Sequence, residues 1–355
     1  MKRIPQLDSI RGMAVLAVLL HNTDITKATG LIGREGWMGV DLFFALSGFL
    51  ITSLLLDTKG TDGYFRNFYA RRCLRIWPLY YSALLFMFVV VPILRPPEAV
   101  RIFGEQSMPW WSYPIYLQNF LVRAITRAAG LLGVTWSLAV EEQFYLVWPL
   151  VVRYCSEAKL RIVTLSIIGL GPVLRFYLVQ HHVNVYPNTF CRLDGLMAGA
   201  LLAILFRSPM FRRENYLRLA WVTFFVALPI GVFAFHHAIW AAFSFTAMAS
   251  AALLYLGLRS TQKWLQALLS SRFLIYTGTI SYGIYLLEKI PIDAAQLLHL
   301  DRHPVIVLLV TAAATYLLAT LSWNMLEKPC LRLKRFFESS RRERTRVEPM
   351  LANAA

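Results

Sequence analysis

The sequence predicts an all-α, polytopic integral membrane protein with about ten transmembrane helices and one re-entrant or interfacial helix. Of its 355 residues, 57% are hydrophobic and only 16% are charged, whereas a soluble domain is about 45–50% apolar and about 25% charged. Several apolar runs approach the roughly 20 residues that a helix needs to cross a bilayer. The composition therefore excludes a soluble enzyme, a disordered chain and a secreted disulfide scaffold.

Ten apolar segments are expected to span the membrane as one compact domain over residues 1–330, followed by a basic cytoplasmic tail over 331–355. The first begins behind Met1-Lys2-Arg3, as a signal peptide would, but it contains Arg11 and His21 and is not followed by a small-residue cleavage site. It is therefore kept as a span. The ten expected spans are 7–26, 37–56, 77–95, 135–153, 162–180, 192–206, 217–235, 238–258, 273–292 and 304–326.

An eleventh apolar stretch, 109–123, contains two prolines and the polar pair Gln118 and Asn119. It is short and polar on one side, so it is predicted to be re-entrant or interfacial. Counting it as a span would invert every later loop and weaken the charge asymmetry between the two sides. With ten spans, most of the 36 Lys and Arg residues fall on the side of the termini. The positive-inside rule then places both termini in the cytoplasm.

The net charge of +16 would suggest nucleic acid in a soluble chain. Here the basic residues lie between apolar spans, so the expected partner is the lipid bilayer and no nucleic acid is expected. The four cysteines are far apart and form no CxxC pair. They indicate neither a metal site nor a disulfide framework.

Charged residues within spans are functional hypotheses because they are costly in hydrocarbon. In the predicted orientation, the outer half of the membrane holds one histidine and several carboxylates: His21, Asp41, Glu141, Glu142, Asp194 and Glu288. Arginines occupy the inner half or its mouth: Arg11, Arg71, Arg72 and Arg75. A histidine among carboxylates suits proton transfer or nucleophilic catalysis. An arginine cluster suits a phosphate-bearing ligand that enters from the cytoplasm.

Four blocks, in order, resemble the membrane acyltransferase-3 family over nearly the whole chain. They are LDSIRG at 7–12 with the later His21-Asn22, VDLFFALSGFLI at 40–51, FYARRCLRIWPLY at 68–80, and TWSLAVEEQFY at 135–145. The resemblance implies transfer of an acyl group, most often acetyl from acetyl-CoA, to a carbohydrate hydroxyl. It implies His21 as the catalytic residue, with Arg11, Arg72 and Arg75 essential or donor-binding.

Two features depart from the family pattern. Nine residues separate Arg11 from His21, where the family usually has ten, so the two side chains are turned by about 100° relative to that pattern. Glu288 follows the block ISYGIYLL at 280–287, where the family commonly has a histidine. No role of that histidine carries over to this chain.

The candidate site combines the residue chemistry with the resemblance. The expected catalytic residues are His21, Arg11, Asp41, Glu141 and Glu142, and the expected acyl-CoA ligands are Arg72, Arg75 and Arg71, with no metal. Several alternatives stay open. The arginines could be positive-inside anchors, and Asp8 and Arg11 could form a structural pair. Asp41 could either orient His21 or serve as a packing residue. The spacing does not choose between Glu141 and Glu142, and Ser47-Gly48 is expected to permit close helix approach.

The predicted function is an inner-membrane O-acyltransferase with acetyl-CoA, or another acyl-CoA such as succinyl-CoA, as donor and a carbohydrate or glycan as acceptor. His21 would act as a general base or as a nucleophile that forms acyl-histidine. The alternative is a transporter or flippase for a lipid-linked sugar or a small solute, which would use the same buried groups as a proton relay. The sequence does not identify the acceptor.

Overall fold

A computed structural model describes most of the chain. The described residues are 4–23, 33–94, 108–122, 131–208, 211, 214–297 and 304–337. Their regular structure is helical throughout, with no strand, which confirms the all-α prediction. The end of the expected first span, the end of the third and most of the basic tail (338–355) lie outside the described residues.

Six helical segments among the described residues are long and apolar enough to cross a membrane, so the multi-pass prediction is confirmed and the number ten stays a prediction. They are α3 (Met38–Asp57), α4 with its continuation (Tyr64–Val90), α9 (Glu157–Gln180), α11 (Asn215–His237 of Glu214–His237), α12 (Ile239–Arg259) and α17 with its continuation (Val305–Phe337). Three further helices coincide with expected spans: α1 (Pro5–Asn22), α8 (Trp136–Tyr154) and α10 (Thr189–Leu205). These three helices lie at the positions along the chain that the sequence predicts.

Helix α4 begins at Tyr64, well before the expected start at residue 77. Gly63 precedes it in a left-handed conformation with φ of 70°, which a glycine adopts without strain. Tyr64 and Phe68 are buried in the core, so apolar packing holds this first part of the helix in place. The arginine block at 71–75 therefore lies on a rigid helix and not in a loop.

The expected span at 273–292 is wrong as a single helix. The structure breaks it into α14 (Arg272–Thr279), α15 (Ser281–Leu287) and α16 (Lys289–Leu297). Pro291 explains the second break, because its ring occupies the space beside the carbonyl of Leu287 and it has no N–H to donate. The break leaves Glu288 between two helix ends.

The described part of the stretch at 109–123, which is 109–122, forms two short helices, η2 (Trp110–Ser112) and α7 (Gln118–Leu121), and no span, as its polar residues predict. Buried amides fix it to the bundle. Asn119 donates to Thr189 Oγ1 at 2.8 Å, and Gln143 donates to Asn119 Oδ1 at 2.9 Å. Gln118 donates to the Thr135 carbonyl at 3.1 Å. These bonds hold α7 against the starts of α8 and α10.

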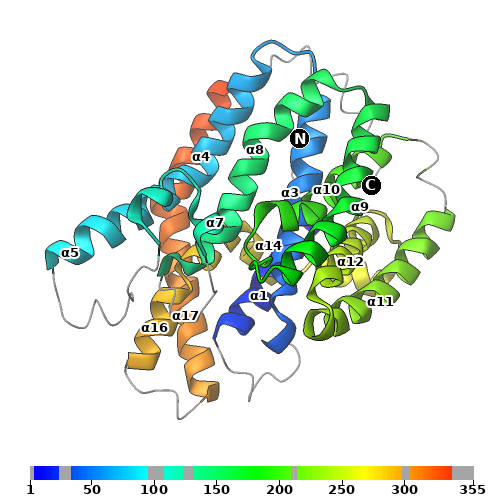
Figure 1. Ribbon diagram of the computed structural model, residues 1–355. Coiled ribbons are helices and arrows are strands. Elements are labelled where there is room, and N and C mark those ends of the chain that lie inside the picture. The colour runs from blue at the N-terminus through cyan, green and yellow to red at the C-terminus, as the bar shows by residue number, and fades with distance from the viewer. Residues whose placement is uncertain are drawn as a thin grey trace.

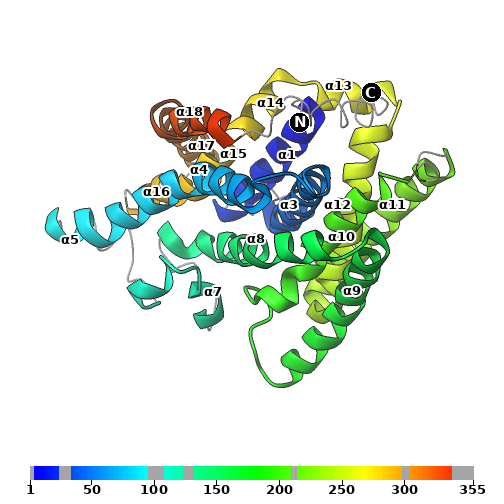
Figure 2. The same ribbon diagram turned by 90° about the horizontal axis from the view of Figure 1, so that it is seen from above.

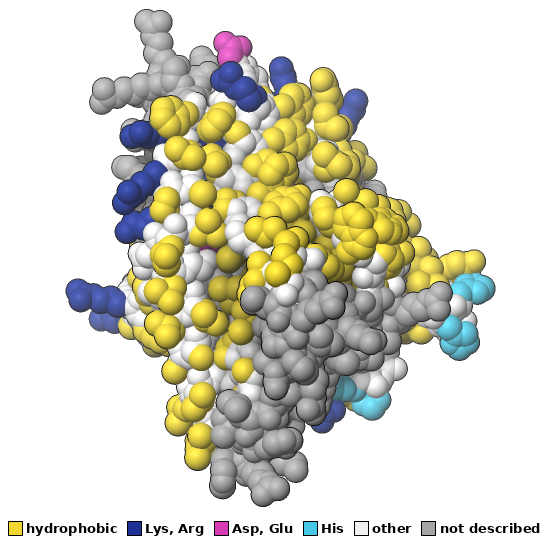
Figure 3. Space-filling model, turned by 90° about the vertical axis from the view of Figure 1, so that its left-hand side faces the viewer, with side chains coloured by type: hydrophobic (Ala, Val, Ile, Leu, Met, Phe, Trp, Pro, Cys, Tyr) yellow, Lys and Arg dark blue, Asp and Glu magenta, His cyan; other side chains and the backbone are white. Residues whose placement is uncertain are grey.

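Helices α1 and α3 lie at the centre of the bundle, with α8, α10, α12 and α14 packed around them (Figures 1 and 2). Hydrophobic side chains cover much of the face shown in Figure 3, and the visible Lys and Arg side chains lie mainly toward its upper and left edges. An apolar belt of this kind is what lipid contact requires. Helix α9 likewise exposes large apolar side chains such as Leu170, Val173 and Tyr177.

Small residues bring α3 and α10 into close contact. A Cβ on Gly48 would collide with the carbonyl oxygen of Leu196, and a Cβ on Gly199 would collide with that of Ala45. Close backbone approach at glycine is a common means of helix association in membranes. The expected role of Gly48 in close packing is confirmed.

Candidate active site

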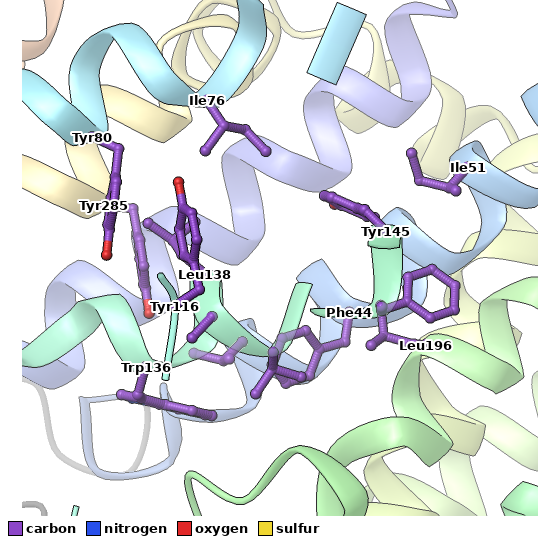
Figure 4. Packing of buried hydrophobic residues seen from close by; sticks show 14 of the residues in the cluster. Phe44, Ile51, Ile76, Tyr80, Tyr116, Trp136, Leu138, Tyr145, Leu196 and Tyr285 are labelled. Carbon is purple, nitrogen blue, oxygen red and sulfur yellow. The ribbon is translucent and has the colours of Figure 1, made fainter. Parts of the chain in front are cut away.

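A cavity of about 110 Å³ lies between α1, α3, α4, α8 and α15. Its polar lining contains three of the expected arginines and one expected carboxylate. The lining residues with polar or charged tips are Arg11, Ser47, Arg72, Arg75, Ser137, Glu141, Tyr145, Ser281, Tyr282 and Tyr285. Figure 4 shows the apolar wall around it, where Phe44, Ile76, Leu138, Tyr145 and Tyr285 point toward one another from four helices.

The arginines reach this cavity from two helices. Arg11 of α1 forms an ion pair of 3.3 Å with Asp8, one turn earlier, and its side chain is 27% exposed. Arg72 of α4 lies over the rings of Phe68 and Tyr145, with its guanidinium carbon 5.9 and 5.8 Å from the ring centres. No described residue accepts a hydrogen bond from the buried Nε of Arg72. This donor of Arg72 is therefore available to a ligand.

The structure distinguishes the two adjacent glutamates of α8. Glu141 lines the cavity and accepts a hydrogen bond from Ser47 of α3. Glu142 does not line the cavity but lies within electrostatic range of Arg72 and beside the indole of Trp77. Glu141 is therefore the carboxylate that faces the space between the arginines.

His21 lies at the other end of α1, about 15 Å from Arg11 at 1.5 Å per residue. It is partly buried, and its Nδ1 is 2.9 Å from the carbonyl oxygen of Gly33. A carbonyl only accepts, so Nδ1 carries the proton in this bond and Nε2 keeps a lone pair. His21 is not part of the cavity lining around Arg11.

The residue after His21 ties this end of α1 to the break between α15 and α16. Asn22 donates to Glu288 Oε1 at 2.5 Å. Glu288 is completely buried, and its Oε2 has no partner among the described residues. Glu288, at the position where the family commonly has a histidine, thus lies next to the end of α1 that carries His21.

Asp41 contacts neither His21 nor the cavity. It forms an ion pair of 2.5 Å with Arg192 of α10 and accepts a 2.7 Å hydrogen bond from Thr246 of α12. The structure shows no contact through which Asp41 could orient His21. The surroundings of Asp41 fit the alternative, which is a packing residue. Together with Thr246, the pair joins three helices.

Arg71 also differs from its neighbours on α4. Its Nε donates to the carbonyl oxygen of Phe337 at 2.8 Å, and Nη2 donates to the same oxygen. It is absent from the cavity lining. The structure thus separates Arg71, which holds the C-terminal segment, from Arg72 and Arg75, which face the cavity.

The sequence matches the family described as "Acyltransferase domain" (acyltransferase-3) over residues 4–324. The chain belongs to the acyltransferase-3 family. The match covers every helix that contributes to the cavity, so the resemblance inferred from the four sequence blocks is confirmed. No solved structure matches the chain.

Similar proteins of bacteria are named as O-acetyltransferases. A Staphylococcus aureus (strain COL) protein named "Putative O-acetyltransferase" is 27% identical over 93% of this chain and 57% of its own length. "Putative peptidoglycan O-acetyltransferase YrhL" of Bacillus subtilis is 31% identical over 96% of this chain and 56% of its own. Peptidoglycan O-acetyltransferase OatA of Listeria monocytogenes is 27% identical over 92% and 56%. The chain spans little more than half the length of these relatives.

Two buried arginines of this acyltransferase domain escaped the sequence analysis as candidates. Arg192, the first residue of the expected span 192–206, is 1% exposed and pairs with Asp41. Arg175 is fully buried and forms a 2.9 Å ion pair with Asp194, while Ser244 donates to the same carboxylate. Its position within a predicted span was a usable signal, because an intramembrane charge requires a partner. In the described part of the chain, no group of three His, Cys, Asp or Glu residues is arranged to bind a metal.

Proposed function

We propose that this protein is a multi-pass membrane O-acetyltransferase that moves an acetyl group from cytoplasmic acetyl-CoA to a hydroxyl of a carbohydrate. The observation that carries the proposal is the meeting of Arg11, Arg72 and Arg75 at one cavity in an acyltransferase domain. The names of the relatives favour a peptidoglycan sugar as acceptor. We therefore propose a cell-envelope glycan as the acceptor of this protein.

The donor binds at the arginine end. CoA carries a pyrophosphate and a 3′-phosphate, and arginine binds such groups through charge-assisted, often bidentate hydrogen bonds. Arg72 and Arg75 would contact these phosphates, and Arg11 would line the path of the pantetheine arm toward the interior. Most basic residues flank the expected cytoplasmic ends of the spans, which supports donor entry from that side. The protein would then reside in the cytoplasmic membrane with both termini inside.

His21 performs the chemistry through Nε2, since Nδ1 donates to Gly33. As a general base, Nε2 takes the proton of the acceptor hydroxyl while that oxygen attacks the thioester carbonyl. The C–S bond breaks, and the CoA thiolate recovers the proton. As a nucleophile, Nε2 first displaces CoA thiolate to form acetyl-histidine, and the thiolate takes up a proton. The acceptor hydroxyl oxygen then attacks the acetyl carbon, the bond to Nε2 breaks to restore the imidazole, and the hydroxyl proton is released to solvent.

The separation of the two ends favours the nucleophilic route. About 15 Å of helix separates Arg11 from His21, and the donor and the glycan would approach from opposite faces of the membrane. A covalent carrier on His21 would pass the acetyl group between them. Incubation of purified protein with [14C]acetyl-CoA without acceptor separates the routes. Label retained by wild type and absent in His21→Ala supports acetyl-histidine, and absence of label from both supports the general base.

The test of the function is formation of an ester. Purified protein in nanodiscs is incubated with [14C]acetyl-CoA and muropeptides or whole cell-envelope glycans, and alkali-labile label on the glycan is counted together with released CoA thiol. We expect equal amounts of both products, dependent on the acceptor. A transporter or flippase would yield neither product. The absence of both with every acyl-CoA and glycan tried would overturn the proposal.

A further inference from the structure

We propose that Lys334 is a further ligand of the donor phosphates, held at the arginine cluster by the C-terminal segment of the domain. The inference rests on the proposed function, since it names an additional residue of the same donor site. It is carried by the path of the C-terminal segment, by the charges around Lys334 and by the contrast with its neighbour Arg335.

The C-terminal segment η7 (Leu333–Phe337) packs on α4, the helix that carries the arginine block. It follows α17 (Pro304–Ser322), η6 (Trp323–Glu327) and α18 (Lys328–Arg332), all of which continue one helical path. The two hydrogen bonds from Arg71 to the Phe337 carbonyl fasten its end. A segment expected as part of the basic cytoplasmic tail is thus fixed to the helix that carries the cavity arginines.

The charged groups that act most strongly on Lys334 are of its own sign. Its side chain is half-buried, and its strongest electrostatic interactions are with four arginines: Arg72, Arg75, Arg71 and Arg11. No carboxylate of another described residue lies within ion-pair distance of Lys334, Arg72 or Arg75. Like charges repel strongly in a partly desolvated site, so this arrangement is suited to a polyanion placed among them.

The acids near this cluster are already engaged with the arginines. Asp8 pairs with Arg11, Glu141 and Glu142 lie within electrostatic range of Arg72, and the buried Glu327 lies within electrostatic range of Arg75. These four carboxylates are fewer than the five basic groups of the cluster, which are Arg11, Arg71, Arg72, Arg75 and Lys334. Lys334 therefore adds a positive charge beyond what these local carboxylates offset. A ligand with several phosphate charges, such as the nucleotide end of CoA, supplies the missing negative charge.

Arg335, the next residue, provides the contrast. It is exposed, and its guanidinium lies over the ring of Phe336 with a distance of 4.8 Å to the ring centre. Two adjacent basic residues thus have different surroundings, one among the arginines and one at the surface. Arg335 is the matched control because its substitution removes the same charge from the same segment.

The experiment uses the full chain in phosphatidylcholine nanodiscs and compares wild type with Lys334→Gln, Lys334→Arg and Arg335→Gln. Acetyl-transfer kinetics with acetyl-CoA and equilibrium binding of [3H]CoA are both measured. We expect Lys334→Gln to raise KM and Kd about tenfold, as loss of one charge-assisted hydrogen bond would, with kcat within about twofold. Lys334→Arg is expected to retain most of the affinity, and Arg335→Gln to match wild type. The same variants are assayed with acetyl-pantetheine, which has no phosphate, and no difference between them is expected.

The outcomes separate the two proposals. If wild type transfers acetyl groups but Lys334→Gln and Arg335→Gln are alike in KM and Kd, the role of Lys334 is overturned and the proposed function stands. If wild type neither binds CoA nor transfers acetyl groups, the proposed function itself fails. A lipid headgroup is the other source of phosphate. Phosphatidylglycerol nanodiscs test this source. If they weaken CoA binding by wild type but not by Lys334→Gln, and the two proteins have the same Kd for CoA in phosphatidylcholine, then Lys334 binds lipid and the inference is overturned.

Discussion

Asp41 and Arg192 form an ion pair of 2.5 Å in which both residues are at most 2% exposed. The Arg192 guanidinium also lies 3.8 Å from the ring centre of Phe243. Two charges removed from water in this way are stable only as a pair. The ion pair therefore gives Asp41 a structural role, because it stabilises the packing of α3, α10 and α12.

We expect Asp41→Ala to lower the free energy of unfolding by about 3–5 kcal/mol, because Arg192 is then a buried charge without its partner. Thermal unfolding in detergent measures the effect. The control is Arg161→Ala, which breaks the exposed 4.0 Å pair with Glu157 and should cost under about 1 kcal/mol. An Asp41→Ala protein as stable as wild type but without turnover would instead make Asp41 catalytic.

Gly48→Val should destabilise the contact between α3 and α10, since even a Cβ at this position meets the Leu196 carbonyl. Overpacking of a tight interface commonly costs about 1–3 kcal/mol. Gly169→Ala on the lipid-facing side of α9 is the control. A Cβ there meets no atom within 4 Å, and alanine favours a helix over glycine by about 1 kcal/mol. Equal thermal stability of the two variants would contradict the close packing.

Glu288→Ala should reduce kcat about tenfold with little change in KM for acetyl-CoA. The reason is that Asn22, which adjoins His21, loses the carboxylate that fixes the end of α1. Glu288→Gln keeps an amide oxygen for Asn22 and is expected to recover most of the rate. Steady-state kinetics of the two variants test this positioning role. A similar loss in both would show that the charge of Glu288 matters and not its hydrogen bond.

Arg72→Gln and Arg75→Gln should each raise KM for acetyl-CoA about tenfold while kcat changes less, because both residues are proposed to hold the donor phosphates. The increase should shrink at high ionic strength, where the remaining charges are screened. Arg66→Gln, an exposed change on the same helix, is the control. If all three variants have the KM of wild type, the donor phosphates bind elsewhere.

Hydropathy predicted most of the helices of this fold, because a span needs a long apolar run that is visible in the sequence. The polar pair at Gln118 and Asn119 likewise predicted a short element in place of a span. The break at Pro291 was missed, although the proline is visible, because many membrane helices accommodate proline through neighbouring groups. Whether a helix continues through such a residue depends on packing that no single segment encodes.

For the candidate site, the motif blocks predicted the cavity residues Arg11, Arg72, Arg75 and Glu141, which the structure brings together. They did not separate Glu141 from Glu142, because adjacent residues differ only in the face of the helix they occupy. Lys334 was counted with the basic tail, since its contact with the arginines depends on helices that pack across a long sequence separation. Charge alone predicted a phosphate-bearing ligand, and tertiary structure was needed to show which of the basic residues meet at one cavity.

The most direct test of the account is acetyl transfer by His21→Ala. Purified wild type, His21→Ala and His236→Ala are compared for [14C]acetyl ester formed on the glycan acceptor and for Kd of CoA. His236 is the control because it is a histidine bound to Glu35 at 2.9 Å, outside the cavity lining. We predict that His21→Ala retains CoA binding and loses at least about 100-fold in rate, whereas His236→Ala stays near wild type. Undiminished ester formation by a folded His21→Ala protein would contradict the account.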